Sequence, residues 1–119
     1  MKAMRNPLIL VLDDDPIFRR IVDRFASRNH LNVVTCKDLA ELKAIWRRTP
    51  PELAVIDFNL GEEINGTDIA RLLGNTPVLL VSRNSARIPP KSTWSANILE
   101  YLDKNAGIPT LLDRANVLA

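Results

Sequence analysis

Short apolar runs alternate along the chain with longer stretches in which apolar residues recur every three or four positions. The short runs are four to six residues long, and most of them lack the polar alternation of a half-exposed strand. Such runs are typical of strands buried on both faces of a parallel sheet. We therefore predict strands over residues 8–12, 33–36, 53–58, 77–81 and 98–102.

The longer stretches predict helices between these strands. The first helix is expected to begin at Pro16, with Asp15 as its N-cap, and to end at Asn29 and His30. The second is expected to begin after Asp38 and to stop before Pro50. The residues expected to face the core are Ile17, Phe18, Ile21, Val22 and Phe25 in the first helix, and Leu39, Leu42, Ile45 and Trp46 in the second.

The second half of the chain has a weaker helical pattern. A short third helix is expected after Thr67 or Asp68 as its cap, ending at Gly74. Pro89 and Pro90 interrupt the stretch 83–96, so a full helix is not expected there. The residues expected to face the core are Ile69, Leu72 and Leu73 in the third helix, and Leu111, Leu112, Ala115 and Leu118 in a final helix over residues 110–118.

Strands that alternate with helices indicate an α/β fold, with one parallel sheet covered by helices on both faces. The chain has 119 residues, so we expect a single domain over residues 1–119 with its core in residues 8–118. A net charge of +2 is too small to indicate nucleic-acid binding. The single cysteine, Cys36, excludes an internal disulfide, and no run is long enough to span a membrane. We expect a soluble, cytoplasmic protein.

Polar residues follow four of the predicted strands. Asp13 and Asp14 follow the first strand, Asp57 lies at the end of the third, Ser82 follows the fourth and Lys104 follows the fifth. Because the carboxyl ends of parallel strands meet at one edge of the sheet, these side chains are expected to converge. Clustered carboxylates repel one another, and Mg²⁺, which prefers oxygen ligands, would relieve that repulsion. The site could then accept a phosphoryl group, with one carboxylate as the nucleophile.

These motifs resemble those of the receiver domains of bacterial two-component response regulators. The resemblance covers residues 8–118 and rests on sequence stretches that occur in the family's order. They are Leu10-Val11-Leu12-Asp13-Asp14-Asp15-Pro16, then Arg19-Arg20, Val55-Ile56-Asp57-Phe58-Asn59, Ser82, and Tyr101-Leu102-Asp103-Lys104. The resemblance implies a flavodoxin-like, doubly wound sheet of five parallel strands in the order 2-1-3-4-5, with a short or irregular fourth helix.

The resemblance also implies a role for each residue. Asp57 matches the phosphoacceptor, with Lys104 and Ser82 as the groups that contact the phosphoryl oxygens. Asp14, Asp57, the backbone carbonyl of Asn59 and, through water, Asp13 would hold Mg²⁺. Ser82 and Tyr101 would form the switch, and Asn84 would join Asn59 in setting the rate of hydrolysis. The implied donor is a histidine kinase or a histidine phosphotransfer protein, and the implied output is a protein-binding face. No direct binding to nucleic acid or to a membrane is implied, and the domain would catalyse only its own phosphotransfer and dephosphorylation.

Several positions depart from the family pattern. Asn105 replaces a proline, so the Lys104–Asn105 peptide is expected to be trans. Arg83 stands where a small residue is usual, and it could obstruct donors or bind the phosphate itself. Gly61 replaces a common proline in a loop, 57–66, that is one residue longer than usual.

Two alternatives remain open from the sequence. Arg83, Asn105 and the irregular stretch 83–96 are compatible with a degenerate receiver that binds a partner without phosphorylation. A phosphatase of the haloacid dehalogenase type would use the Asp-x-Asp spacing of Asp13 and Asp15, although Pro16 and Ile17 replace the Gly-Thr usual there.

Overall fold

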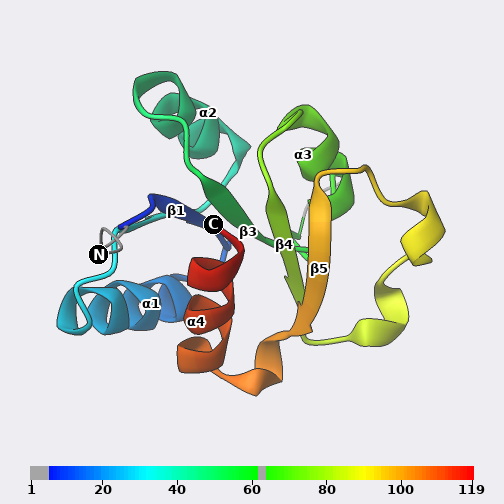
Figure 1. Cartoon of the computed structure of the whole chain (residues 1–119). Helices are drawn as coiled ribbons and strands as arrows, with labels where there is room; N and C mark the ends of the chain where they lie inside the picture. The colour runs from blue at the N-terminus through cyan, green and yellow to red at the C-terminus, as the bar shows by residue number, and fades with distance from the viewer. Residues whose placement is uncertain (1–5, 62–63) are drawn as a thin grey trace, which may run out of the picture.

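The computed structural model describes residues 6–61 and 64–119, so the first five residues of the predicted domain and two residues of the loop 57–66 lie outside the described residues. Five parallel strands form one sheet in the order β2-β1-β3-β4-β5, which confirms the predicted fold class and strand order (Figure 1). The strands are β1 (Ile9–Leu12), β2 (Val33–Cys36), β3 (Leu53–Asp57), β4 (Val78–Ser82) and β5 (Ile98–Asp103). The helices are α1 (Pro16–Arg28), α2 (Leu39–Arg48), α3 (Gly66–Leu72) and α4 (Ile108–Leu118).

Helices cover both faces of the sheet, and each face has its own core. On one face α1 and α4 pack against the strands through Phe18, Val22, Leu111 and Leu112. On the opposite face α2 and α3 pack through residues such as Leu42 and Ile69 (Figure 1). The three central strands β1, β3 and β4 are fully buried, because helices cover them on both sides. Their uninterrupted apolar sequences follow from that double coverage.

The face that α1 turns to the sheet is narrower than the sequence pattern predicted. Phe18, Val22 and Ala26 are buried, whereas Ile17 is 68% exposed and Ile21 is 48% exposed. The expectation that both isoleucines face the core was therefore wrong. The buried residues recur every four positions, and Phe25 is partly buried against the same core, so the contact stripe is narrow and Ile17 and Ile21 lie at its edge.

The third helix differs from its prediction in both its cap and one core residue. Its N-cap is Asn65, not Thr67 or Asp68, and Leu72 is 59% exposed rather than buried. The Asn65 side chain accepts hydrogen bonds from the backbone N–H groups of Thr67 and Asp68, while the Asp68 carboxylate accepts one from the Asn65 N–H. This reciprocal pair is a capping box, so Asp68 belongs to the first turn of the helix.

Gly66, the first residue of α3, allows the helix to start directly against the end of β3. A Cβ at this position would lie 2.8 Å from the Asp57 carbonyl oxygen and 2.8 Å from the Cα of Phe58. Any other residue would push α3 away from this strand end. The close approach therefore fixes the backbone next to Asp57.

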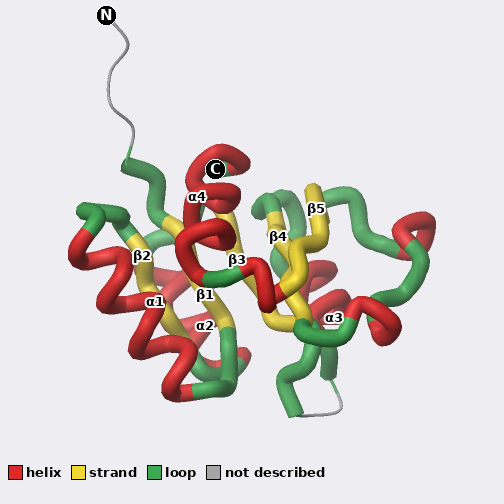
Figure 2. The backbone as a smooth tube through the Cα atoms, turned by 90° about the horizontal axis from the view of Figure 1, so that it is seen from below, coloured by secondary structure: helices red, strands yellow, loops and turns green. Residues whose placement is uncertain are grey.

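The segment between β4 and β5 is irregular, as the sequence predicted. It contains two 3₁₀ turns, Ser85–Arg87 and Lys91–Thr93, in place of an α-helix. Figures 1 and 2 both show it beyond β5, outside the edge of the sheet. The Trp94 indole N–H donates to the Pro89 carbonyl at 3.0 Å, and the Trp94 ring packs against the core. The segment is thus held in place by side-chain packing and short 3₁₀ hydrogen bonds rather than by an α-helix.

The last helix, α4, starts two residues earlier than predicted. It begins at Ile108, after Gly107, whose φ of 96° lies outside the range that favours other residues. Arg114 of α4 donates two hydrogen bonds to the Glu100 carboxylate of β5, at 2.7 and 2.5 Å. This bidentate ion pair joins α4 to the edge strand.

Cys36 provides a direct test of this packing. It is 1% exposed, and burial, together with the nearby Glu41 and Asp38 carboxylates, raises the pKa of its thiol to about 12. Since the thiolate is the reactive form, the folded thiol should react with a disulfide reagent at pH 8 at least about a hundredfold more slowly than the unfolded one. Labelling followed by absorbance, with and without urea, measures this ratio. Complete labelling of the folded protein at the rate of a free thiol would contradict the packing of β2.

Candidate functional site

The polar residues that follow the strands converge at one edge of the sheet. Asp13 and Asp14 come from the end of β1, Asp57 from the end of β3 and Lys104 from the turn after β5. The pairing of β3 with β4 sets Asp57 beside Val81, one residue before Ser82. The predicted convergence is therefore present for Asp13, Asp14, Asp57 and Lys104, and it follows from parallel pairing in register.

Lys104 bridges two buried carboxylates. Its Nζ lies 2.5 Å from Asp13 Oδ2 and 3.4 Å from Asp57 Oδ2. All three side chains are no more than 6% exposed. The approach to Asp13 is an ion pair without hydrogen-bond geometry, because Asp13 Oδ2 has no hydrogen-bond partner. The ammonium also lies 4.2 Å from the centroid of the Phe18 ring, in a cation–π arrangement.

The electrostatics of this group favour protonation of Asp57. Burial raises the pKa of the Asp57 carboxyl from 3.8 to about 6, and the neighbouring Asp13 carboxylate also raises it. Lys104 and the Asn59 backbone N–H, which donates to Asp57 Oδ1 at 3.3 Å, act in the opposite direction. The desolvation of a buried carboxylate thus outweighs the single buried cation.

Asp13, Asp14 and Asp57 form the acidic cluster that the sequence predicted. Each contributes one carboxylate oxygen, and these oxygens lie within 4.8 Å of one another. Asp14 is exposed, whereas the other two are buried. A Cβ at Gly61 would lie 3.2 Å from Asp14 Oδ2, so a glycine here leaves room around that carboxylate. An all-oxygen donor set with one exposed ligand suits a hard divalent cation such as Mg²⁺.

A cavity of about 250 Å³ opens beside these carboxylates. Its lining includes four site residues that the sequence predicted, Asp14, Asp57, Asn59 and Lys104. Arg83 and Asp15 also line it. The cavity is large enough for a small anionic group and is open to solvent on the side of Asp14 and Arg83, both of which are exposed.

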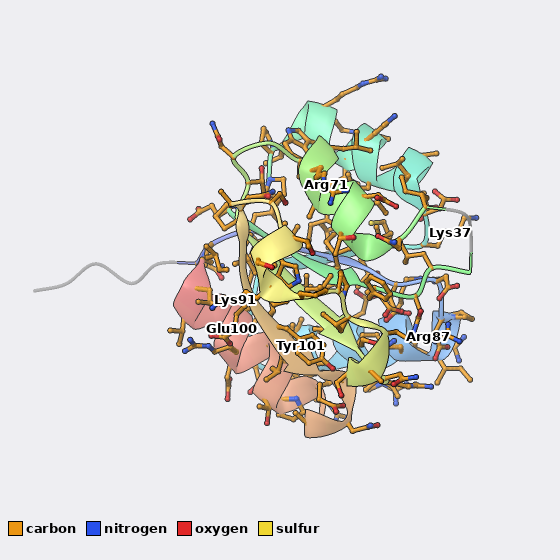
Figure 3. All side chains as sticks on the ribbon, turned by 90° about the vertical axis from the view of Figure 1, so that its right-hand side faces the viewer. Lys37, Arg71, Arg87, Lys91, Glu100 and Tyr101 are labelled. Carbon is orange, nitrogen blue, oxygen red and sulfur yellow. The ribbon has the colours of Figure 1, made fainter. Side chains whose placement is uncertain are left out.

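Ser82 and Tyr101 are close together, but the Ser82 hydroxyl is turned toward its own loop. Ser82 Oγ accepts a hydrogen bond from the Asn84 N–H at 3.0 Å and donates to the Asn84 carbonyl at 3.3 Å. The Tyr101 hydroxyl donates to the Ser82 carbonyl at 3.2 Å. Tyr101 lies beside Glu100 on β5, as labelled in Figure 3. The two residues expected to form a switch are thus joined through the backbone of Ser82.

Several contacts of the site were not predicted from the sequence. Phe18 was expected to be a core residue, yet its ring also lies against the Lys104 ammonium. Arg19 of α1 was not predicted as a site residue, yet its guanidinium donates to the Asp13 carbonyl at 2.7 Å. Asp15 caps α1 as predicted. The described residues contain no cis peptide bond, so the expected trans Lys104–Asn105 bond is confirmed, and Lys104 reaches both carboxylates with it.

The sequence matches one protein family and two curated relatives over part of their length. The profile of the response regulator receiver domain family matches residues 9–116. A curated relative, the photosynthetic apparatus regulatory protein RegA of Cereibacter sphaeroides, is 38% identical over 66 residues, which cover 56% of this chain and 35% of the relative. The regulatory protein VirG of Rhizobium rhizogenes is 27% identical over 77 residues, 62% of this chain and 32% of that protein. The matched segments thus span about a third of each relative's length.

Solved structures share the fold. The receiver domain of the Francisella response regulator 1452 is 25% identical with a TM-score of 0.76, and the match covers 95% of this chain and 96% of that one. The chemotaxis protein CheY4 of Vibrio cholerae is 17% identical with a TM-score of 0.76, covering 97% and 100%. None of the helices in the described part of the chain has the length and apolarity needed to cross a membrane.

The pKa of Asp57 has a measurable consequence for stability without metal. A carboxyl whose pKa is about 6 when folded and 3.8 when unfolded stabilises the fold below pH 4, and this contribution is lost as the pH rises through 6. Between pH 5 and 8 in a chelator, the free energy of unfolding should therefore fall by about 1 kcal/mol relative to that of Asp57→Asn. Urea unfolding of both proteins measures this difference. Parallel pH profiles would show that the Asp57 pKa is not raised.

Proposed function

The chain belongs to the response regulator receiver domain family of two-component systems, and we propose on this basis that it accepts a phosphoryl group on Asp57 and thereby switches a protein-binding face. The observation that carries the proposal is the buried ion-pair group, in which Lys104 contacts both Asp13 and Asp57 at the edge of an open cavity. A buried lysine held at a carboxylate is suited to neutralise further negative charge placed on that carboxylate. The remaining roles follow from the positions of the other residues around Asp57.

In the proposed reaction, a carboxylate oxygen of Asp57 attacks the phosphorus of a phosphohistidine. The new bond joins this oxygen to phosphorus, the phosphorus–nitrogen bond breaks, and its electron pair stays on the imidazole, which takes up a proton. Hydrolysis reverses the modification, because water attacks the phosphorus and releases inorganic phosphate and the Asp57 carboxylate. A pKa of about 6 leaves Asp57 mostly ionised, and therefore nucleophilic, at pH 7. The domain would catalyse no other reaction.

The acidic cluster fits Mg²⁺. Asp14 and Asp57 would hold the ion, with the Asn59 backbone carbonyl as a further ligand and Asp13 as the acceptor of a bound water. Asp13 Oδ2, which forms an ion pair with Lys104 but accepts no hydrogen bond, and the room that Gly61 leaves around Asp14 support this assignment. When bound, Mg²⁺ supplies positive charge to the phosphoryl oxygens and relieves the repulsion among the carboxylates.

The protein residues around Asp57 have separate roles in this proposal. Lys104 would bind one phosphoryl oxygen, and Ser82 would leave its hydrogen bonds with Asn84 to bind another. This movement would shift the Ser82 backbone to which the Tyr101 hydroxyl is bonded, so the Tyr101 ring would change position. Asn59, which lines the cavity, and Asn84, two residues after Ser82, would set how fast water reaches the phosphorus.

The donor would be a histidine kinase or a histidine phosphotransfer protein, which places the exchange in the cytoplasm, where such donors are charged from ATP. The exposed isoleucines Ile17 and Ile21 offer an apolar docking surface on α1, whose N-cap residue, Asp15, lines the cavity. Exposed apolar residues beside a reactive site are a common mark of a protein-binding surface. Regulation by a downstream protein partner, rather than by direct binding to nucleic acid, completes the proposal.

A second function has specific support. Arg83 lines the cavity, and the segment between β4 and β5 forms no α-helix. Both features are compatible with a degenerate receiver that binds its partner without phosphorylation. Partner binding that is unchanged by Asp57→Asn and by chelation of Mg²⁺ would establish this alternative.

The test of phosphoacceptance is incubation with acetyl phosphate and Mg²⁺, followed by intact-mass measurement. Wild type should gain the mass of one phosphoryl group, and Asp57→Asn or excess chelator should abolish the gain. Asp103→Asn is the matched control, because Asp103 is also a carboxylate at a strand end but its side chain accepts from the Asn105 N–H, outside the acidic cluster. A folded wild-type protein that gains no mass would refute the proposal. A full mass gain by the Asp57→Asn variant would refute it as well.

A further inference from the structure

Arg83 occupies an unusual place in the site. It follows directly after Ser82, lines the cavity together with Asp57 and Lys104, and is itself exposed. Its Nη2 lies 3.8 Å from Asp15 Oδ2, and the two side chains are 64% and 35% exposed. An exposed pair at this distance is weak, so the guanidinium can leave Asp15 easily.

The carboxylates around the cavity outnumber the cations that neutralise them, and Arg83 can supply further positive charge. Four carboxylates, those of Asp13, Asp14, Asp15 and Asp57, surround or line the cavity. Lys104 is committed to two of them, and Arg19 is committed to the Asp13 carbonyl. Among the described residues that line the cavity, Arg83 is the one cation without a close, buried partner.

Asp15 can release Arg83 without loss of its structural role. Its two carboxylate oxygens serve different partners, because Oδ1 accepts the Ile17 N–H at 2.9 Å and Oδ2 faces Arg83. Departure of the guanidinium therefore leaves the N-cap of α1 in place.

We propose that Arg83 is a phosphoryl-binding residue that Asp15 holds in reserve until a phosphoryl group occupies the cavity. The inference rests on the proposed function, since it concerns the same phosphoryl group on Asp57. A guanidinium presents two parallel donors that match two phosphoryl oxygens, and a phosphoryl group is a stronger acceptor than a carboxylate 3.8 Å away. Asp15 and the phosphoryl group then compete for one arginine, and phosphorylation breaks the Arg83–Asp15 pair.

The direct test uses beryllofluoride, a phosphoryl mimic that binds a carboxylate oxygen, titrated in Mg²⁺ and followed by fluorine NMR. Arg83→Gln should weaken its binding about tenfold, because one charge-assisted contact is lost. Arg83→Lys should recover part of the loss through its charge, but not the two-point contact. Arg87→Gln is the matched control, since Arg87 is an exposed arginine of the same segment that does not line the cavity (Figure 3). Equal or tighter binding by Arg83→Gln would overturn the inference.

A double-mutant comparison tests the competition with Asp15. Asp15→Asn retains a residue that caps helices well and removes the partner of Arg83. It should tighten beryllofluoride binding more in the wild-type background than in Arg83→Gln, because only the former contains an arginine to release. The effect of removing one negative charge is common to both backgrounds and cancels in the comparison. Equal effects in the two backgrounds would show that Asp15 does not hold Arg83.

The two proposals fail in different ways. If wild type does not bind beryllofluoride in Mg²⁺, phosphoacceptance fails, and the role of Arg83 falls with it. If wild type binds and Arg83→Gln binds equally well, phosphoacceptance stands and Arg83 has no part in it. Thermal unfolding of each variant checks that these exposed substitutions leave the fold intact.

Discussion

The site depends on one buried ammonium. Lys104 Nζ lies 2.5 Å from Asp13, 3.4 Å from Asp57 and 4.2 Å from the centroid of the Phe18 ring. Without this cation, the two buried carboxylates would repel each other, and nothing would offset the free energy lost by removing them from water. Even with it, burial keeps the pKa of Asp57 at about 6. The site is therefore electrostatically unsatisfied without further positive charge, and this is the physical basis for its proposed affinity for Mg²⁺.

The fold supplies this arrangement through local devices at the ends of strands. Parallel pairing aligns the ends of β1, β3 and β4. Gly66 lets α3 approach the Asp57 backbone, and the Asn65 capping box starts the helix at that point. Gly61 leaves room beside Asp14. The loops that hold the carboxylates are thus fixed by the starts of α1 and α3. The proposed switch runs through Ser82, the last residue of β4, and Tyr101 of the edge strand β5. In the proposed switch, a local electrostatic event at Asp57 would act through this bonded pair to change a binding face.

Apolar runs that end in polar residues were sufficient to predict a parallel sheet and the convergence of Asp13, Asp57 and Lys104, whereas the strand order came from the resemblance to receiver domains. The apolar pattern did not separate the buried from the exposed side of α1. Ile21 has the right spacing for a core residue, and its exposure depends on the angle at which the helix meets the sheet, which periodicity does not contain. The pairing of Arg83 with Asp15 was equally out of reach, since it joins two loops that are 68 positions apart in the chain, and charge alone does not specify a partner.

A double-mutant cycle on Lys104 and Asp13 tests the central claim most directly. The free energy of unfolding is measured in chelator for wild type, Lys104→Met, Asp13→Asn and the double variant. If the buried ammonium offsets the burial of the carboxylates, Lys104→Met should lower the free energy of unfolding by roughly 3 kcal/mol. Much of this loss should be absent in the Asp13→Asn background. A coupling of about 2 kcal/mol or more is expected. Additive effects of the two substitutions would contradict the account.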